Sequence, residues 1–86
     1  MRTKPVSTLL PKVAKISLVD EVIRAMRQML EKDIWTAGSK LPSELELSRQ
    51  LGVGRSTIRE ALRVLGHRGL VESRTGLGTY VTQQTM

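Results

Sequence analysis

Three arginines recur at every fourth position in the second half of the chain, at Arg55, Arg59 and Arg63. On a helix, which turns by about 100° per residue, they fall within an arc of about 80°. Arginine presents a planar fork of N–H donors that pairs bidentately with the O6 and N7 atoms of guanine. Ser56 and Thr57 follow the first arginine and offer short hydroxyl groups suited to phosphate oxygens or nearby base edges. These residue types at this spacing indicate a surface that contacts nucleic acid.

The same arginines have a second interpretation, in which they form a solvated helix face paired with Glu60 and other acidic neighbours. The arginine spacing alone does not separate the two interpretations. The surrounding elements and the net charge of the chain favour nucleic acid. Two further arginines, Arg68 and Arg74, are either additional phosphate contacts or simply solvated.

The arginine face belongs to an expected third helix that begins at Arg55. Apolar residues recur along it at i, i+3, i+4 and i+7, which predicts a buried stripe beside the arginines, formed by Ile58, Ala61, Leu62 and Leu65. Gly69 is the expected C-terminal cap of this helix. His67, close to the helix end, is expected to be exposed or to interact with the helix dipole.

A shorter helix is expected directly before it. Ser43 and Glu46 form an S-x-x-E capping box at its start, two leucines four residues apart face the core, and the helix stops at Gly52. We expect both glycines of Gly52-Val53-Gly54 to be free to adopt positive φ in a tight turn. A short turn containing glycine between two helices is typical of a helix-turn-helix.

A first helix of about four turns is expected near residues 18–33. Ser17, with Asp20 three positions later, resembles a capping box at its start. Its apolar stripe recurs at three- and four-residue steps and comprises Val19, Val22, Ile23, Met26 and Leu30. In the loop that follows, Trp35 is expected to be a packing anchor and Gly38 to end the helix.

After Gly69 the pattern changes to that of strands. Residues 70–74 and 79–82 have the Thr, Tyr and Val content of short strands, and Thr75-Gly76-Leu77-Gly78 between them is a hairpin turn. The expected fold class is therefore mainly α with a small β-hairpin: a winged helix-turn-helix of three helices plus a β wing.

The expected organisation is a single domain flanked by two short segments. We place a basic N-terminal arm at 1–16, the domain at 17–82 and a tail or linker start at 83–86, with the helix-turn-helix at about 44–63 and the wing at about 70–82. The arm is either a solvated terminus or a segment that touches phosphates.

Composition narrows the function. The chain has 86 residues, and 14 Lys and Arg against 8 Asp and Glu give a net charge of +6, which favours a polyanionic partner. Cysteine is absent and His67 is the only histidine, so we expect no metal site, no cofactor and no enzyme. No apolar run approaches the ~20 residues that span a bilayer, so no membrane partner is expected.

Rival binding functions fit the pattern less well than double-stranded DNA does. A winged helix used for protein–protein interaction needs an exposed apolar patch, whereas the third helix presents arginine and hydroxyl groups. Aromatic residues form only 2% of the chain and leave little to stack on the splayed bases of RNA. We therefore expect the third helix to enter the major groove of DNA and the wing to enter the adjacent minor groove.

Several motifs of this chain resemble those of one family. Residues 41–48 read LPSELELS, residues 51–62 read LGVGRSTIREAL, and GLVE at 69–72 leads to GLGTYV at 76–81. This succession resembles the DNA-binding domain of the GntR family of bacterial transcription regulators, and it is most similar to the FadR subfamily. The resemblance covers about Ser17 to Thr82, which is nearly the whole chain.

The resemblance implies residue roles beyond those that spacing indicates. In the family, two arginines and two small hydroxyl residues of the third helix contact operator bases or phosphates, and the wing tip reaches the minor groove; here the corresponding residues are Arg55, Arg59, Ser56, Thr57, Thr75 and Gly76. Family members bind near-palindromic operators as homodimers, and a small-molecule effector at a C-terminal helical domain alters that binding. The resemblance thus implies a regulator in the bacterial cytoplasm, associated with the nucleoid.

This chain departs from the family pattern in three places. Leu45 stands where many relatives place an arginine that touches the DNA backbone, so one phosphate contact is expected to be missing. Gly54 stands where Ser or Thr caps the third helix, and a glycine cap costs only about a few tenths of a kcal/mol. The chain stops shortly after the wing, so it is either a fragment of a longer regulator or a protein without the family's sensing domain; our hypothesis is that it is a fragment.

Overall fold

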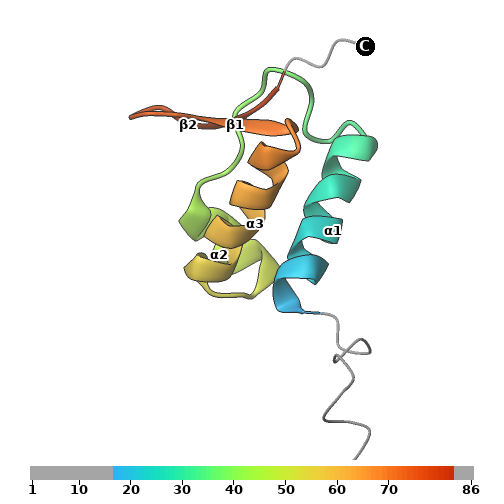
Figure 1. The fold of residues 1–86 in the computed structure, drawn as a ribbon, viewed down its shortest axis with the longest axis vertical. Helices are drawn as coiled ribbons and strands as arrows, with labels where there is room; N and C mark the ends of the chain where they lie inside the picture. Colours follow the sequence, from blue (N-terminus) through green and yellow to red (C-terminus); the bar gives the residue numbers. More distant parts are fainter. Residues whose placement is uncertain (1–16, 83–86) are drawn as a thin grey trace, which may run out of the picture.

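The computed structural model describes residues 17–82, so the N-terminal arm and the tail lie outside the described residues. Three helices, α1 (Leu18–Glu31), α2 (Glu44–Leu51) and α3 (Arg55–His67), are followed by strands β1 (Val71–Arg74) and β2 (Gly78–Val81). The strands form an antiparallel hairpin that lies across one end of the helices (Figure 1). The predicted fold of three helices and a β-hairpin is confirmed.

Helix α1 begins where the sequence predicts and ends two residues earlier than expected. The backbone N–H of Asp20 donates to the Ser17 hydroxyl at 3.1 Å, which caps the N-terminus. At the other end Lys32 is the C-cap, and Asp33 adopts the left-handed conformation with φ of 59°. The left-handed backbone at Asp33 ends the helix before this residue, and Asp tolerates this conformation better than most residues.

The segment between α1 and α2 runs back along β2, which the sequence did not predict. The N–H of Gly38 donates to the carbonyl of Val81 at 2.9 Å, and the N–H of Val81 donates to the carbonyl of Ser39 at 2.8 Å. The N–H of Leu41 donates to the carbonyl of Thr79 at 2.8 Å. The expectation that Gly38 ends α1 is therefore wrong, because this glycine pairs with the hairpin instead.

The turn between α2 and α3 uses its two glycines differently. Ser43 caps α2 by accepting the N–H of Glu46 at 3.1 Å, and Gly52 ends it in the left-handed conformation with φ of 70°. Gly54 has φ of −70° and is the extended N-cap of α3, without a side-chain hydrogen bond. Of the two glycines that are free to adopt positive φ, only Gly52 does so, and the missing side-chain cap of α3 is confirmed.

Helix α3 passes into the hairpin through a Schellman motif. The N–H of Leu70 donates to the carbonyl of Leu65 at 2.9 Å, the N–H of Gly69 donates to that of Gly66 at 3.0 Å, and Gly69 has φ of 76°. Leu70 therefore terminates the helix rather than starting the strand. As a result, the strands occupy 71–74 and 78–81 instead of the expected 70–74 and 79–82.

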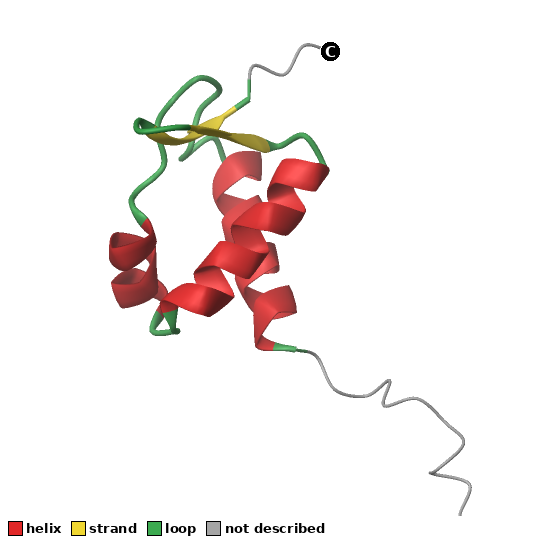
Figure 2. Cartoon of the chain, turned by 60° about the vertical axis from the view of Figure 1, so that its left-hand side comes forward, coloured by secondary structure: helices red, strands yellow, loops and turns green. Residues whose placement is uncertain are grey.

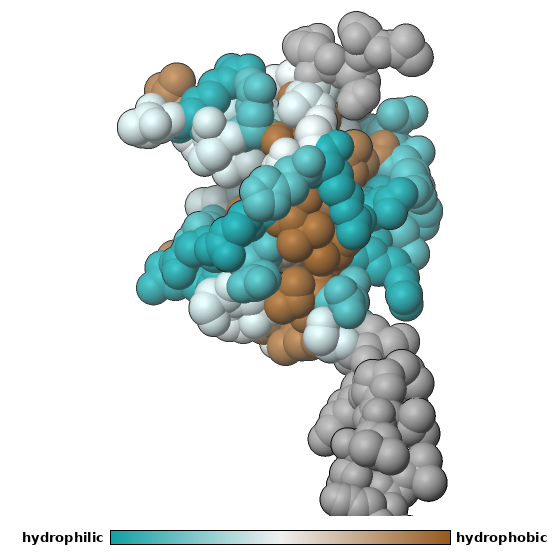
Figure 3. Space-filling model, in the orientation of Figure 1, coloured by the Kyte–Doolittle hydropathy of each residue, from teal (hydrophilic) through white to brown (hydrophobic). Residues whose placement is uncertain are grey.

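The core lies where all five elements meet around α3. From α3, the stripe residues Ile58, Ala61 and Leu65 are fully buried, and the other buried apolar residues are Val22, Ile23, Met26, Leu41, Leu47, Val71 and Val81. Half-buried Trp35 packs against this core, as predicted. Figure 2 shows the hairpin closing one end of the crossed helices, and apolar side chains gather along the junction of α1 and α3 in Figure 3.

Candidate nucleic-acid interface

The first turn of α3 carries three of the predicted site residues. Arg55 and Ser56 are exposed, and Thr57 is half-buried. The N–H groups of Thr57 and Ile58 donate to the carbonyl of Gly54 at 3.1 and 3.2 Å. The N–H groups of Arg55 and Ser56 precede this first helical bond, so they remain available to an anion such as a phosphate.

Arg59, one turn further along α3, is held by α2. Its Nε donates to Oε2 of Glu44 at 3.3 Å, and its Nη2 donates to Oε1 of the same carboxylate at 3.0 Å. These hydrogen bonds and the negative charge of Glu44 raise the pKa of Arg59 above its usual value. The side chain of Arg59 is nevertheless 57% exposed, and the pair therefore lies on the surface.

The remaining arginine of this face has only a loose partner. Nη1 of Arg63 lies 3.9 Å from Oε1 of Glu60, with both side chains more than half exposed. Among residues 17–82, Arg55 takes part in no ion pair. The solvated-face interpretation thus accounts for Arg63, whereas the shorter of the two ion pairs on this face joins Arg59 to Glu44 of a different helix.

The hairpin forms a wing on which the side chain of Arg74 contacts those of Glu72 and Tyr80. Arg74 donates two hydrogen bonds to Oε2 of Glu72, from Nε at 2.9 Å and from Nη2 at 2.8 Å. Its guanidinium carbon also lies 4.2 Å from the centroid of the Tyr80 ring. The turn beyond Arg74 is exposed at Thr75 and Gly76, and Gly76 has φ of 75°. The tip therefore presents backbone with little side-chain cover.

Two adjoining hollows connect α3 to the wing. One includes Arg59, Arg63 and His67 in its lining, and the other includes Ser43, Thr75 and Gly76. They share four lining residues, which are Glu44, Leu62, Ser73 and Thr79. We call this continuous concave surface the α3–wing groove. It brings Arg59 together with the predicted wing-tip residues, whereas Arg55, Ser56 and Thr57 line neither hollow and lie at the first turn of α3.

Lys40 is a groove residue that the sequence analysis did not single out. It lies beside the wing through an antiparallel bridge to Tyr80, and it lines the same hollow as the wing tip. A Cβ added at Gly78 would lie 2.8 Å from Cε of Lys40, so the absence of a side chain at Gly78 makes room for the lysine. A glycine at a strand end was the only sequence signal for this close approach.

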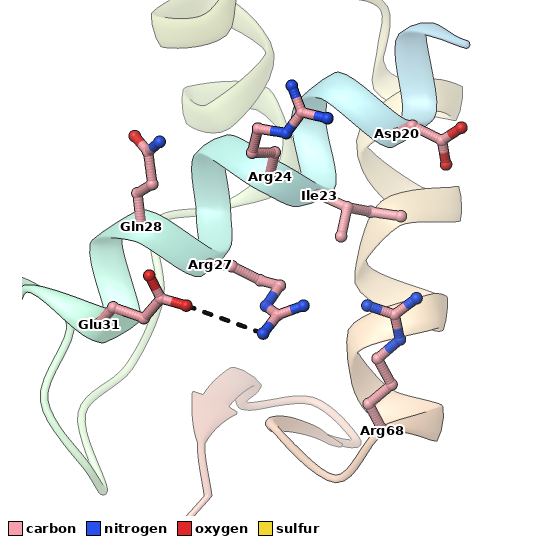
Figure 4. Close-up of a pocket in the computed structure, with 7 residues that line it drawn as sticks. All are labelled: Asp20, Ile23, Arg24, Arg27, Gln28, Glu31 and Arg68. Carbon is pink, nitrogen blue, oxygen red and sulfur yellow. Dashed lines mark ion pairs between the residues drawn. The ribbon is translucent and has the colours of Figure 1, made fainter. Parts of the chain in front are cut away.

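A second arginine-bearing hollow lies on α1, outside the α3–wing groove (Figure 4). Arg24, Arg27 and Arg68 line it together with Asp20 and Glu31. Nη2 of Arg27 lies 3.7 Å from Oε2 of Glu31 within the same helix. Arg68, which the sequence grouped with Arg74 as a candidate phosphate contact, therefore lines a hollow that is separate from the α3–wing groove.

Residues 18–81 match the model of the bacterial regulatory proteins of the gntR family. The chain belongs to the GntR family. Its similarity to regulators extends to named relatives. It is 43% identical over 61 residues to the Uxu operon transcriptional regulator of Escherichia coli K12, covering 71% of this chain and 24% of that protein. It is 34% identical over 73 residues to the histidine utilization repressor of Klebsiella aerogenes, covering 85% of this chain and 30% of that protein.

Solved structures relate this GntR-family chain to a domain bound to DNA. The DNA-binding domain of AraR in complex with operator ORX1 superposes with a TM-score of 0.75 at 29% identity, covering 95% of this chain and 93% of that chain. The AraR domain in complex with operator ORE1 gives a TM-score of 0.76 at 32% identity, over 85% of this chain and 89% of that chain. The chain is thus a winged-helix domain of the GntR family, homologous to transcription regulators.

Two further observations concern metal ligands and membrane-spanning helices. Within residues 17–82, no three His, Cys, Asp or Glu side chains are placed to hold a metal ion. No helix in that part of this GntR-family chain has the length and apolar character to cross a membrane.

Proposed function

We propose that this GntR-family domain binds a specific sequence of double-stranded DNA, with α3 in the major groove and the wing in the adjacent minor groove. The observation that carries the proposal is the α3–wing groove, in which Arg59 and Arg63 of α3 and the wing tip line one concave surface. The likeness to a domain solved with operator DNA and the net charge of +6 support it.

The proposed contacts divide by chemistry. Arg55 and Arg59 read bases or hold phosphates, and Ser56 and Thr57 donate to phosphate oxygens at the open start of α3. Thr75 and Gly76 place exposed backbone against the sugar-phosphate surface of the minor groove. Each of these residues is exposed or half-buried, as contact with DNA requires.

Lys40 supplies a phosphate contact from the side of the groove next to the wing. Many relatives carry an arginine that contacts the DNA backbone at the position of Leu45, which is 43% exposed on α2. In our proposal Lys40 has the same kind of role, from a different element. A lysine is a flexible point charge, so Lys40 adds affinity for the DNA backbone without sequence information.

The whole regulator extends beyond this domain in our proposal. The chain spans only about a quarter to a third of the length of its curated relatives. On the resemblance of its motifs, we place it in the FadR subfamily and propose that it pairs as a homodimer on a near-palindromic operator. A small-molecule effector would act through a C-terminal domain, and the protein would work in the bacterial cytoplasm as a regulator rather than an enzyme.

The division of the chain follows the same proposal. Residues 17–82 are the DNA-binding unit, with the helix-turn-helix at about 44–63 and the wing at about 70–82. Residues 1–16 are a basic arm that precedes it, and 83–86 begin the connection to the effector domain.

Selection from random-sequence duplexes, repeated over a series of salt concentrations, tests the function. We expect one motif with two-fold symmetry to be enriched, and we expect Arg55→Ala to relax it. Salt-sensitive binding without an enriched motif would mean that this domain attracts DNA only through its charge.

A further inference from the structure

We propose that Glu44 is a positioning residue for base recognition: its carboxylate fixes the guanidinium of Arg59 so that the free end of the fork is aimed into the α3–wing groove. The inference rests on the proposed function, because it assigns how one residue of that site achieves specificity. Glu44 itself need not touch DNA. It acts through Arg59, to which it is joined by two hydrogen bonds.

The geometry of the pair leaves the terminal N–H donors of Arg59 free. The two carboxylate oxygens of Glu44 accept from Nε and Nη2, which form the side of the guanidinium nearest the rest of the side chain. Arginine has five N–H donors, and this arrangement occupies two of them. Both hydrogens of Nη1 and one of Nη2 remain. The end of the fork, formed by Nη1 and Nη2, therefore keeps a parallel pair of donors that fits O6 and N7 of guanine.

The capped N-terminus of α2 fixes the position of the Glu44 backbone. Glu44 is the first residue of α2, and the Ser43 cap immediately before it accepts the N–H of Glu46 at 3.1 Å. The Glu44 side chain is 38% exposed, and Glu44 lines both hollows of the α3–wing groove. A carboxylate on α2 thus holds a guanidinium on α3, and the distance between the two helices fixes the direction of the arginine.

The charges of the pair predict where the effect will be seen. Glu44 neutralises much of the attraction of Arg59 for phosphates, so the pair contributes little to general affinity for DNA. A free arginine instead samples many rotamers and pairs with any nearby phosphate. Removal of Glu44 should therefore change sequence discrimination, while the loss of a negative charge beside DNA should strengthen nonspecific binding. A residue that merely repels DNA would give only the second effect.

A double-mutant cycle on the motif enriched by the unaltered domain separates these effects. We expect Glu44→Ala to reduce discrimination about tenfold at the base pair that Arg59→Ala also relaxes, and to reduce none at other positions. In the Arg59→Ala background, Glu44→Ala should cause no further loss. Glu60→Ala, which removes the loose partner of Arg63 at 3.9 Å, is the matched control and should leave the motif unchanged.

Glu44→Gln keeps an acceptor of the same shape and should retain part of the discrimination, and thermal melting of each variant establishes that it is folded. Unchanged discrimination in both folded Glu44 variants would overturn the positioning role, even with Arg59 shown to read a base. If Arg59→Ala leaves the enriched motif unaltered, base reading by Arg59 fails and the inference fails with it. If the unaltered domain enriches no motif, the proposed function itself is wrong.

Discussion

Arg55 and Arg59 have the same chemistry and lie one turn apart on α3, yet their surroundings differ. Arg59 is bound by two hydrogen bonds to Glu44, whereas Arg55 has no ion-pair partner among residues 17–82. Arg55 is also the first residue of α3, beside free backbone N–H groups. We therefore expect Arg59 to act as a fixed reader and Arg55 as an adaptable one that adjusts to the bound DNA.

The first prediction at the residue scale concerns Arg55. Arg55→Ala should weaken operator binding by ~1–3 kcal/mol if the arginine is bidentate to guanine, because both hydrogen bonds to the base are lost. Titration of a labelled operator duplex at fixed salt measures this change. Arg24→Ala, on the exposed side of α1, is the control and should alter affinity far less. Equal losses in the two variants would place the interface elsewhere.

Lys40 gives a prediction of a different kind. We propose that Lys40 contacts a phosphate, so in Lys40→Ala the slope of log K against log[salt] should become shallower by about 0.9 while the enriched motif stays the same. Lys32→Ala is the matched control, because Lys32 is also exposed but is the C-cap of α1 and lines neither hollow of the α3–wing groove. A changed motif in Lys40→Ala would show that this lysine reads sequence rather than charge.

Helix starts and apolar stripes depend on residues only a few positions apart, and for this reason they could be predicted from the sequence. Ser17 and Ser43 act only on residues three positions later, and the stripe of α3 depends on its own period. Two features depend on contacts between distant segments and were missed. The pairing of Gly38–Leu41 with β2 and the pair of Glu44 with Arg59, 15 residues apart, both require the helices to be packed first. The arginine face was predictable, whereas the partner of Arg59 was not.

The end of α3 offers a prediction at the scale of an element. Gly66 is helical, and a Cβ there would meet only the carbonyl oxygen of Val71 at an ordinary 3.7 Å. Gly66→Ala should therefore stabilise the domain by up to ~1 kcal/mol, because alanine is the better helix former. Gly69 has φ of 76°, so Gly69→Ala should destabilise it by ~1–2 kcal/mol although nothing lies within 4 Å of the new Cβ.

Urea unfolding of the two variants measures these opposite shifts in midpoint. Each glycine serves as the control for the other, since both changes add one methyl group within the same helix end. Destabilisation of Gly66→Ala would mean that this turn of α3 cannot accept a side chain beside β1, and an unaffected Gly69→Ala would contradict the Schellman motif.

At the scale of the whole molecule, α3 serves the core and the interface at once. Ile58, Ala61 and Leu65 are fully buried on one side, while Arg55 and Arg59 are exposed on the other. Helix α1 and the hairpin pack on the buried side and at the helix end (Figure 1). The position of the arginines relative to the wing is therefore fixed by a small core, which in a domain of this size supplies only a modest margin of stability.

Ile58→Val tests whether stability and recognition can be separated. Ile58 is 0% exposed and lies between the two arginines in sequence, and the loss of one methylene should cost ~0.5–1.5 kcal/mol. For a domain of this size, about 1 kcal/mol lowers Tm by ~4–8 °C. Because valine preserves the backbone and the helix, operator affinity measured well below Tm should remain unchanged.

Leu77→Ala is the control for stability, because Leu77 is 58% exposed at the wing turn, and it should leave Tm nearly unaltered. A loss of operator affinity in folded Ile58→Val would instead show that the arginine face depends on the fine packing of the core beneath it.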